Sequence, residues 1–142
     1  MCYAIILSST SSLNLTDLND GLITFDRNMW GLNEEKYLKY PNKWMVMSEE
    51  GCGCGFRHVA EELGFGLPED WYPEDKKGIK ATEKLIKIIR DLVKSGEKVD
   101  CLNPWLDDET KSIEVIEENT VNLNEISDKE FRFNGFKQYV YI

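Results

Sequence analysis

The stretch GIKATEKLIKIIRDLVKSGEKVDCL, residues 78–102, decides the fold, because it places an amphipathic helix directly before a strand. Apolar residues recur in it at helical spacing, while lysines occupy the other face. Gly96 follows the last apolar position, where a helix commonly ends on a glycine. The positions that define the helix are Ile79, Leu85, Ile86, Ile89, Leu92 and Val93. The segment KVDCL, 98–102, then predicts a strand that starts immediately after the helix.

Strand patterns dominate the rest of the chain. CYAIILS (2–8), GLITFD (21–26) and KWMVMS (43–48) are rich in β-branched, aromatic and other apolar residues. FRHVAEEL (56–63) predicts a short helix that ends at Gly64.

Two hairpins are expected in the last third of the chain. Apolar and polar residues alternate over 112–116 and 120–124, around the polar triplet EEN, and this pattern favours the first hairpin. Asn134-Gly135, between aromatic residues at period two, favours the second. We therefore predict a single α+β domain over residues 1–142, with a mixed or mostly antiparallel sheet of about six strands, one long helix and one or two short helices.

Composition narrows the class of protein. The chain has 142 residues, 26 acidic and 17 basic side chains, and a net charge of −9. Nucleic acid and anionic membranes both attract basic surfaces, so neither is an expected partner. No basic segment precedes the short apolar run at the N-terminus, and no run reaches the length of a spanning helix. We expect a small, acidic, soluble, cytoplasmic protein with reduced thiols.

The segment GCGCGFRH, residues 51–58, is the candidate functional site. It holds two of the four cysteines, Cys52 and Cys54, together with Arg57 and the only histidine, His58. The simplest interpretation is a tight turn, in which glycines supply the backbone freedom and the cysteines are buried as small apolar residues.

A second interpretation is a zinc clip in a protein that binds or supports rather than catalyses. Cys52, Cys54 and His58 are ligand types that zinc prefers, and Cys101 (or Cys2) could supply a fourth. A helix that starts near residue 55 would place Cys54 and His58 on one face. The single residue between the two cysteines is fewer than the usual two to four, although Gly53 relaxes this constraint.

A third interpretation is a reactive thiol or an anion-binding site. A cysteine at the start of a helix faces unpaired N–H groups that favour the thiolate. Arg57 would then hold an anionic substrate, and His58 would act as acid or base. Under this interpretation the catalytic residues are Cys52, Cys54, Arg57 and His58, and whether the protein is an enzyme stays open.

CGCGFRHVAEELGF, residues 52–65, resembles the active-site stretch of rhodanese-type sulfurtransferases. The resemblance implies that Cys52 carries a persulfide, that Gly55 is the loop glycine and that Arg57 binds the anion. It also implies a loop between a strand and a helix. The family's Asp-x-Arg and Gly-His-Ile segments are not found upstream, and its alternation of strands and helices differs from the strand-rich pattern here.

Trp71 and Tyr72 form a second candidate surface. They lie between two Pro-Glu-Asp copies in the stretch LPEDWYPEDKKG, 67–78, which predicts a loop with a helical turn or two. The two aromatic side chains could contact a protein partner or cover the cysteines, or they could pack the loop onto the core.

Overall fold

The computed structural model describes residues 2–29, 31–49, 55–59, 76–103, 105–106, 117–127, 131, 133–134 and 137–142. Its elements, in chain order, are β1 (Cys2–Tyr3), β2 (Ile5–Ser9), the 3-10 helix η1 (Leu15–Leu18), β3 (Ile23–Asp26), the 3-10 helix η2 (Asn33–Tyr37), β4 (Asn42–Ser48), β5 (His58–Val59), α1 (Lys76–Lys94), β6 (Val99–Leu102), β7 (Trp105–Leu106), β8 (Glu117–Val121), β9 (Phe133–Asn134) and β10 (Lys137–Tyr141).

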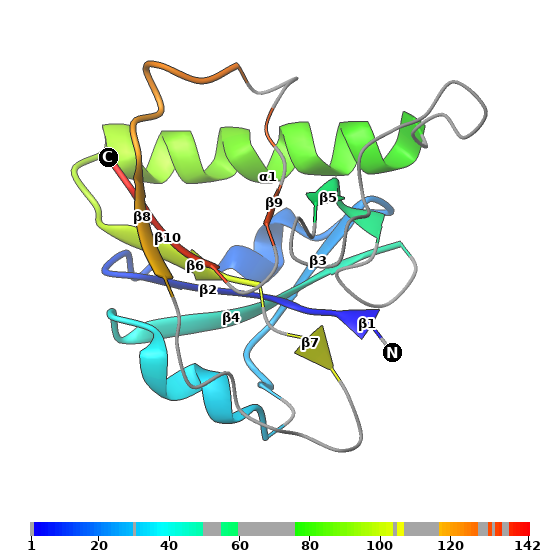
Figure 1. Cartoon of the computed structure of the whole chain (residues 1–142), viewed down its shortest axis with the longest axis horizontal. Helices are drawn as coiled ribbons and strands as arrows, with labels where there is room; N and C mark the ends of the chain where they lie inside the picture. Colours follow the sequence, from blue (N-terminus) through cyan, green and yellow to red (C-terminus); the bar gives the residue numbers. More distant parts are fainter. Residues whose placement is uncertain are drawn as a thin grey trace.

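A six-stranded sheet organises the molecule, with the strand order β3-β4-β2-β6-β10-β8. β8 runs parallel to β10, and every other neighbouring pair in this sheet is antiparallel. α1 lies across one face of the sheet and η2 lies on the other side (Figure 1). The predicted α+β class, with one long helix and a mostly antiparallel sheet, is confirmed.

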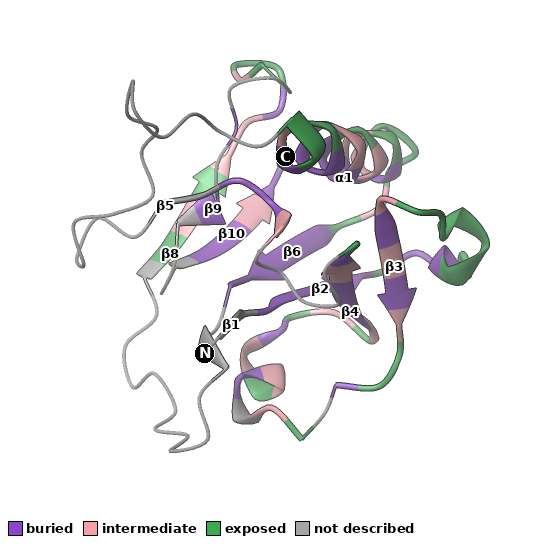
Figure 2. Cartoon of the chain, turned by 90° about the vertical axis from the view of Figure 1, so that its right-hand side faces the viewer, coloured by how far each residue is buried: buried purple, intermediate pink, exposed green. Residues whose placement is uncertain are grey.

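The apolar core between α1 and the sheet, which we call the helix-side core, follows from the helical spacing of apolar residues in α1 and from the alternation of side chains along the strands. Leu85, Ile86 and Ile89 of α1 are fully buried, and Figure 2 shows the buried residues of this helix turned toward the sheet. Ile5 and Leu7 of β2 project from the sheet into the same core. Each such side chain contributes roughly 1.5–3 kcal/mol through burial.

The chain leaves α1 through Gly96, which has a φ of 93°. This left-handed conformation favours glycine, and it lets the backbone turn directly from the helix into β6. The helix end and the strand at 99–102 were both predicted from the sequence, and both are confirmed.

The second face of the sheet carries a smaller apolar cluster. Ala4, Ile6, Met45 and Leu102 lie in it, on the side away from α1. The segment around η2 covers this cluster and contributes the buried Leu38. Among the described residues, no helix is both long enough and apolar enough to cross a membrane.

The sequence predicted a short helix over 56–63, and this prediction is wrong at the described residues 56–59. His58 and Val59 form β5, which pairs in parallel with Phe133 and Asn134 of β9. Pairing with a segment distant in sequence therefore decides this conformation over the local helical pattern. Residues 60–64, which complete the expected helix, lie outside the described residues. The 3-10 helices η1 and η2 lie in connections where the sequence did not predict helix.

Both expected hairpins also differ from the structure. The triplet 117–119, expected to be a turn, begins β8, which pairs in parallel with β10. β9 and β10 flank Asn134-Gly135 but belong to different sheets, because β10 is placed between β6 and β8. Residues 112–116 and 135 lie outside the described part of the chain.

Candidate functional site

The end of the cysteine–glycine segment, which we define as residues 51–58, is attached to α1 by a hydrogen bond. The backbone N–H of Arg57 donates to the hydroxyl oxygen of Thr82 at 2.8 Å. That hydroxyl donates in turn to the carbonyl oxygen of Gly78, also at 2.8 Å. Thr82 is fully buried, so both bonds are shielded from water and fix the backbone at Arg57.

A close backbone approach strengthens this attachment. A Cβ atom added at Gly78 would lie 2.9 Å from the carbonyl oxygen of Gly55. Any side chain at residue 78 would therefore push the cysteine–glycine segment away from α1. Gly78 is needed here for space.

The opposite side of the segment is held by β9. The N–H of Phe133 donates to the carbonyl oxygen of Arg57 at 2.8 Å. The rings of Phe56 and Phe133 pack edge to face, with centroids 6.2 Å apart. The backbone that follows the two cysteines is thus fixed between the helix and a short strand.

Arg57 is a candidate site residue with a buried side chain, which is only 9 % exposed. A buried guanidinium stays charged, so its surroundings must supply hydrogen bonds or negative charge. In the sequence, this positive charge follows Cys54 by three residues and Cys52 by five.

Several candidate residues lie outside the described part of the chain: Cys52, Cys54, Trp71 and Tyr72. His58 is described as the first residue of β5. His58 lies in a strand, so the helix on which the expected pairing of Cys54 with His58 depended is wrong at His58. The pairing itself stays a prediction, because Cys54 lies outside the described residues. The helix expected to start near residue 55 is wrong at His58 and Val59, while the thiolate at Cys54 stays a prediction.

Cys101, proposed from the sequence as a zinc ligand, lies in the helix-side core. It is in β6 and is fully buried. Burial raises the pKa of its thiol strongly, and the nearby Asp100 adds to the shift. A thiolate ligand at Cys101 would therefore carry a large desolvation cost. Cys2 lies in β1, which pairs with β7.

No group of three or more His, Cys, Asp or Glu side chains that could hold a metal ion occurs among the residues that the structure describes. The expected zinc ligands include Cys52 and Cys54, which are not among those residues. The zinc clip therefore stays a prediction.

A buried carboxylate, which the sequence analysis missed, lies on the second face of the sheet. Asp100 of β6 is fully buried, and its two oxygens accept three hydrogen bonds. The Ser8 hydroxyl donates to one oxygen, while the Lys39 N–H (3.1 Å) and the Gln138 amide (2.9 Å) donate to the other. The Gln138 amide also donates to the carbonyl oxygen of Tyr37 at 2.8 Å.

This carboxylate cluster joins three strands to the segment that follows η2. Burial raises the pKa of Asp100, and the bonds from Ser8, Gln138 and the Lys39 backbone oppose that shift. Because the donors occupy both oxygens, the cluster positions the covering segment and leaves little capacity for a ligand. An acid inside the apolar strand KVDCL is the signal that could have revealed it.

Comparison with known proteins adds no relative: no family model, no curated protein and no solved structure matches the chain. The resemblance of residues 52–65 to rhodanese-type sulfurtransferases implies a helix after the loop. β5 lies at 58–59 instead. The residues after the cysteines thus differ from that expectation in their local structure.

Proposed function

We propose that this protein is a thiol protein whose cysteine–glycine segment binds or reacts with a small anionic substrate. The observation that carries the proposal is the burial of Arg57, whose backbone is fixed by Thr82 and Phe133 directly after the two cysteines. A buried positive charge on a fixed backbone favours a thiolate or an anion that lies beside it.

The proposed chemistry assigns one role to each residue. Cys52 or Cys54 provides the nucleophilic sulfur, and Arg57 favours its thiolate form and holds the anion. His58 acts as acid or base. An opposite charge within about 4–6 Å lowers a pKa by roughly 1–3 units, which would bring a thiol from about 8.5 to about 7.

The proposal also covers the compartment and the partners of the protein. We place the protein in the cytoplasm, where thiols stay reduced. The net charge of −9 supports a partner other than nucleic acid or an anionic membrane. The proposed partner is instead a protein that contacts the loop at Trp71 and Tyr72, because aromatic side chains are typical of protein–protein contacts.

Thiol alkylation as a function of pH tests the proposal. Each cysteine is followed by mass spectrometry after brief treatment with iodoacetamide, and buried Cys101 serves as the internal control. We expect one of Cys52 and Cys54 to react with a midpoint near pH 7, and Arg57→Met to raise this midpoint by about one unit. Arg57→Lys, which keeps the charge, should raise it less.

Two results would contradict the proposal. One is a midpoint near 8.5 for both cysteines that Arg57→Met leaves unchanged. The other is stoichiometric zinc in the purified protein that is lost in Cys54→Ser, which would instead establish the zinc clip. Far-UV circular dichroism of each variant separates these results from loss of folding.

A further inference from the structure

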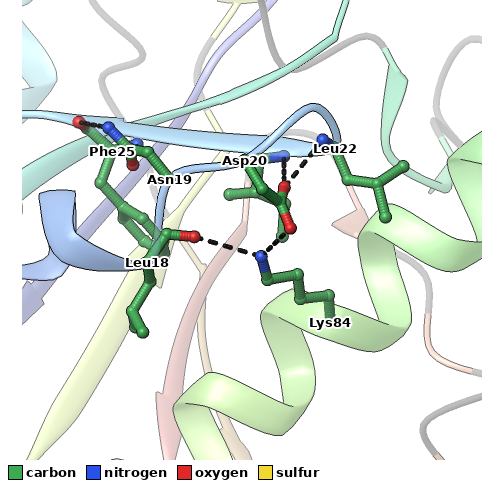
Figure 3. Close-up of polar contacts among 7 residues, drawn as sticks. Leu18, Asn19, Asp20, Leu22, Phe25 and Lys84 are labelled. Carbon is green, nitrogen blue, oxygen red and sulfur yellow. Dashed lines mark hydrogen bonds and ion pairs between the residues drawn. The ribbon is translucent and has the colours of Figure 1, made fainter.

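The β3 edge of the sheet is closed by a side-chain amide. The Asn19 amide donates to the carbonyl oxygen of Phe25 at 3.2 Å and accepts from the Phe25 N–H at 2.6 Å (Figure 3). One side chain thus makes both hydrogen bonds that a neighbouring strand would make to Phe25.

Asp20 closes the same edge one pair further along β3. Its carboxylate accepts from the N–H groups of Leu22 (2.8 Å) and Ile23 (3.0 Å), and its own N–H donates to the Ile23 carbonyl oxygen at 3.0 Å. Lys84 of α1 binds the other carboxylate oxygen and the carbonyl oxygen of Leu18 (Figure 3). Ile23 and Phe25 therefore have both outward backbone groups occupied, and no strand can add there without displacing these bonds.

The opposite edge, β8, has a different arrangement. The Ile142 N–H donates to the carbonyl oxygen of Val121 at 2.9 Å, and the Leu123 N–H donates to the Ile142 carbonyl oxygen at 3.0 Å. The odd-numbered residues of β8 therefore direct their backbone groups toward β10. Because the direction alternates along a strand, Glu118 and Thr120 direct theirs away from the sheet.

Within the residues that the structure describes, these outward groups are open for pairing. Within the described part of the chain, no hydrogen bond is made to the backbone N–H or C=O of Glu118 or Thr120. Thr120 is exposed, and the Glu118 side chain is 50 % exposed. Together, the N–H and C=O groups of Glu118 and Thr120 can form four hydrogen bonds with an added strand.

The edge is also held in place before anything binds. Val121 packs against the helix-side core, and the Glu118 carboxylate forms an ion pair with Lys39 at 3.0 Å. The backbone of Lys39 is itself fixed by Asp100. A preformed edge lowers the entropy cost of adding a strand.

We propose that β8 receives an extended, basic segment of a partner protein as an additional strand, antiparallel to β8. Antiparallel pairs are somewhat more stable per residue than parallel pairs. A lysine or arginine opposite Glu118 would share its exposed carboxylate, and the net charge of −9 favours a basic segment generally. A second copy is disfavoured, since each copy would bring the same excess of acid. This inference is independent of the thiol chemistry.

The test uses a short capped peptide of alternating valine and lysine, added to the whole protein. We expect slower amide exchange at Glu118 and Thr120, measured by NMR, with no change at Ile23 and Phe25 on the closed edge. N-methylation of the peptide should weaken binding at least roughly tenfold, because it removes the backbone donors. A valine–glutamate peptide should bind at least roughly tenfold more weakly than the lysine peptide.

A variant of the protein provides the matched control. Thr120→Pro removes an outward N–H and no bond to β10, so it should weaken peptide binding roughly tenfold, whereas Thr120→Val should not. If Thr120→Pro does not fold, the N-methylated peptide alone decides. Absence of binding, binding that survives N-methylation, equal binding of the glutamate peptide, or dimerisation through β8 without peptide would each overturn the proposal.

Discussion

The two edges of the sheet meet the same physical problem in different ways. At β3, Asn19 and Asp20 fold back and bond every outward backbone group of Ile23 and Phe25. At β8, the outward groups of Glu118 and Thr120 have no such partners among the described residues. Unpaired edges invite association, and natural sheets usually protect them.

The difference teaches that protection is a local property of the preceding turn. Asn19 and Asp20 lie directly before β3, where short polar side chains reach the backbone of the strand that follows. β8 instead carries a charged side chain, Glu118, which interferes with uncontrolled pairing but leaves the backbone open. The β8 edge can therefore pair only with strands that suit the charge of Glu118, whereas the β3 edge cannot pair with an added strand.

The largest expected effect separates the inward and outward sides of β8. Val121→Pro removes a donor that faces β10 and should lower the free energy of unfolding by about 3 kcal/mol. Thr120→Pro, one residue away, should cost about 1 kcal/mol or less, because its N–H faces outward. Urea unfolding of the two variants measures both values. Equal losses would show that the assigned directions of the β8 backbone are wrong.

A smaller loss of stability is expected when the carboxylate cluster is changed, since Asp100 holds the backbone of Lys39, whose side chain pairs with Glu118 of β8. Asp100→Asn replaces an acceptor oxygen by a donor amide, which would meet the donors of Ser8, Gln138 or the Lys39 backbone. We expect a loss of about 2 kcal/mol in urea unfolding at pH 7. Asp91→Asn, at an exposed acid on α1, is the matched control and should change stability by less than about 0.5 kcal/mol.

Opening the closed edge should have a moderate effect on stability and a clear effect on association. Asn19→Ala frees both outward groups of Phe25, and we expect a loss of about 1 kcal/mol, because water replaces part of the lost bonding. We also expect concentration-dependent self-association in sedimentation velocity. Asn14→Ala, at the cap of η1, is a control that leaves β3 closed. A strictly monomeric Asn19→Ala would show that the amide is not needed to protect this edge.

The smallest expected effect is the pH dependence of the closed edge. The hydrogen bond from Lys84, followed by those from the Leu22 and Ile23 N–H groups, lowers the pKa of Asp20 to about 2 from 3.8. Because this pKa is lowered on folding, the contribution is present above about pH 4 and is lost as the pH falls toward 2. We expect about 0.5 kcal/mol at pH 6, since the carboxylate is well exposed.

Urea unfolding of Asp20→Asn and the unmodified protein between pH 6 and 2 measures this contribution. The difference between them should shrink toward zero at the acid end. Asp100 acts with the opposite sign, because burial raises its pKa, so its ionised form costs stability that is recovered as the pH falls through the raised pKa. A difference that stays constant down to pH 2 would mean that the Asp20 side chain acts through contacts that do not depend on its charge.

The parts of the fold that local periodicity specifies were predicted correctly. α1 with its end at Gly96, and the strands β2, β3, β4 and β6, follow from spacing and residue type alone. β5 was not predicted. Strands were expected over parts of β8, β9 and β10, but as hairpins, and this pairing was wrong because strands outside the expected hairpins are their partners. His58 and Val59 show this, since a helical pattern gives way to pairing with Phe133 and Asn134.

The candidate sites show the same limit. Concentrated cysteine, glycine, arginine and histidine made residues 51–58 visible in the sequence, but their roles remain predictions. The anchors of that segment, Gly78 and Thr82, were invisible because helical glycine and threonine carry no local sign of a contact with Gly55 and Arg57. Asp100 was overlooked because its donors come from three different elements.

The position of β10 between β6 and β8 has a consequence during translation. β8 is synthesised before β10, which is its neighbour in the sheet. At about 5–20 residues per second, the ribosome needs roughly one to four seconds to proceed from Val121 to Tyr141. During that interval the nascent β8 has neither edge paired within the sheet, so chaperones that capture extended segments have time to act on it before the sheet is complete.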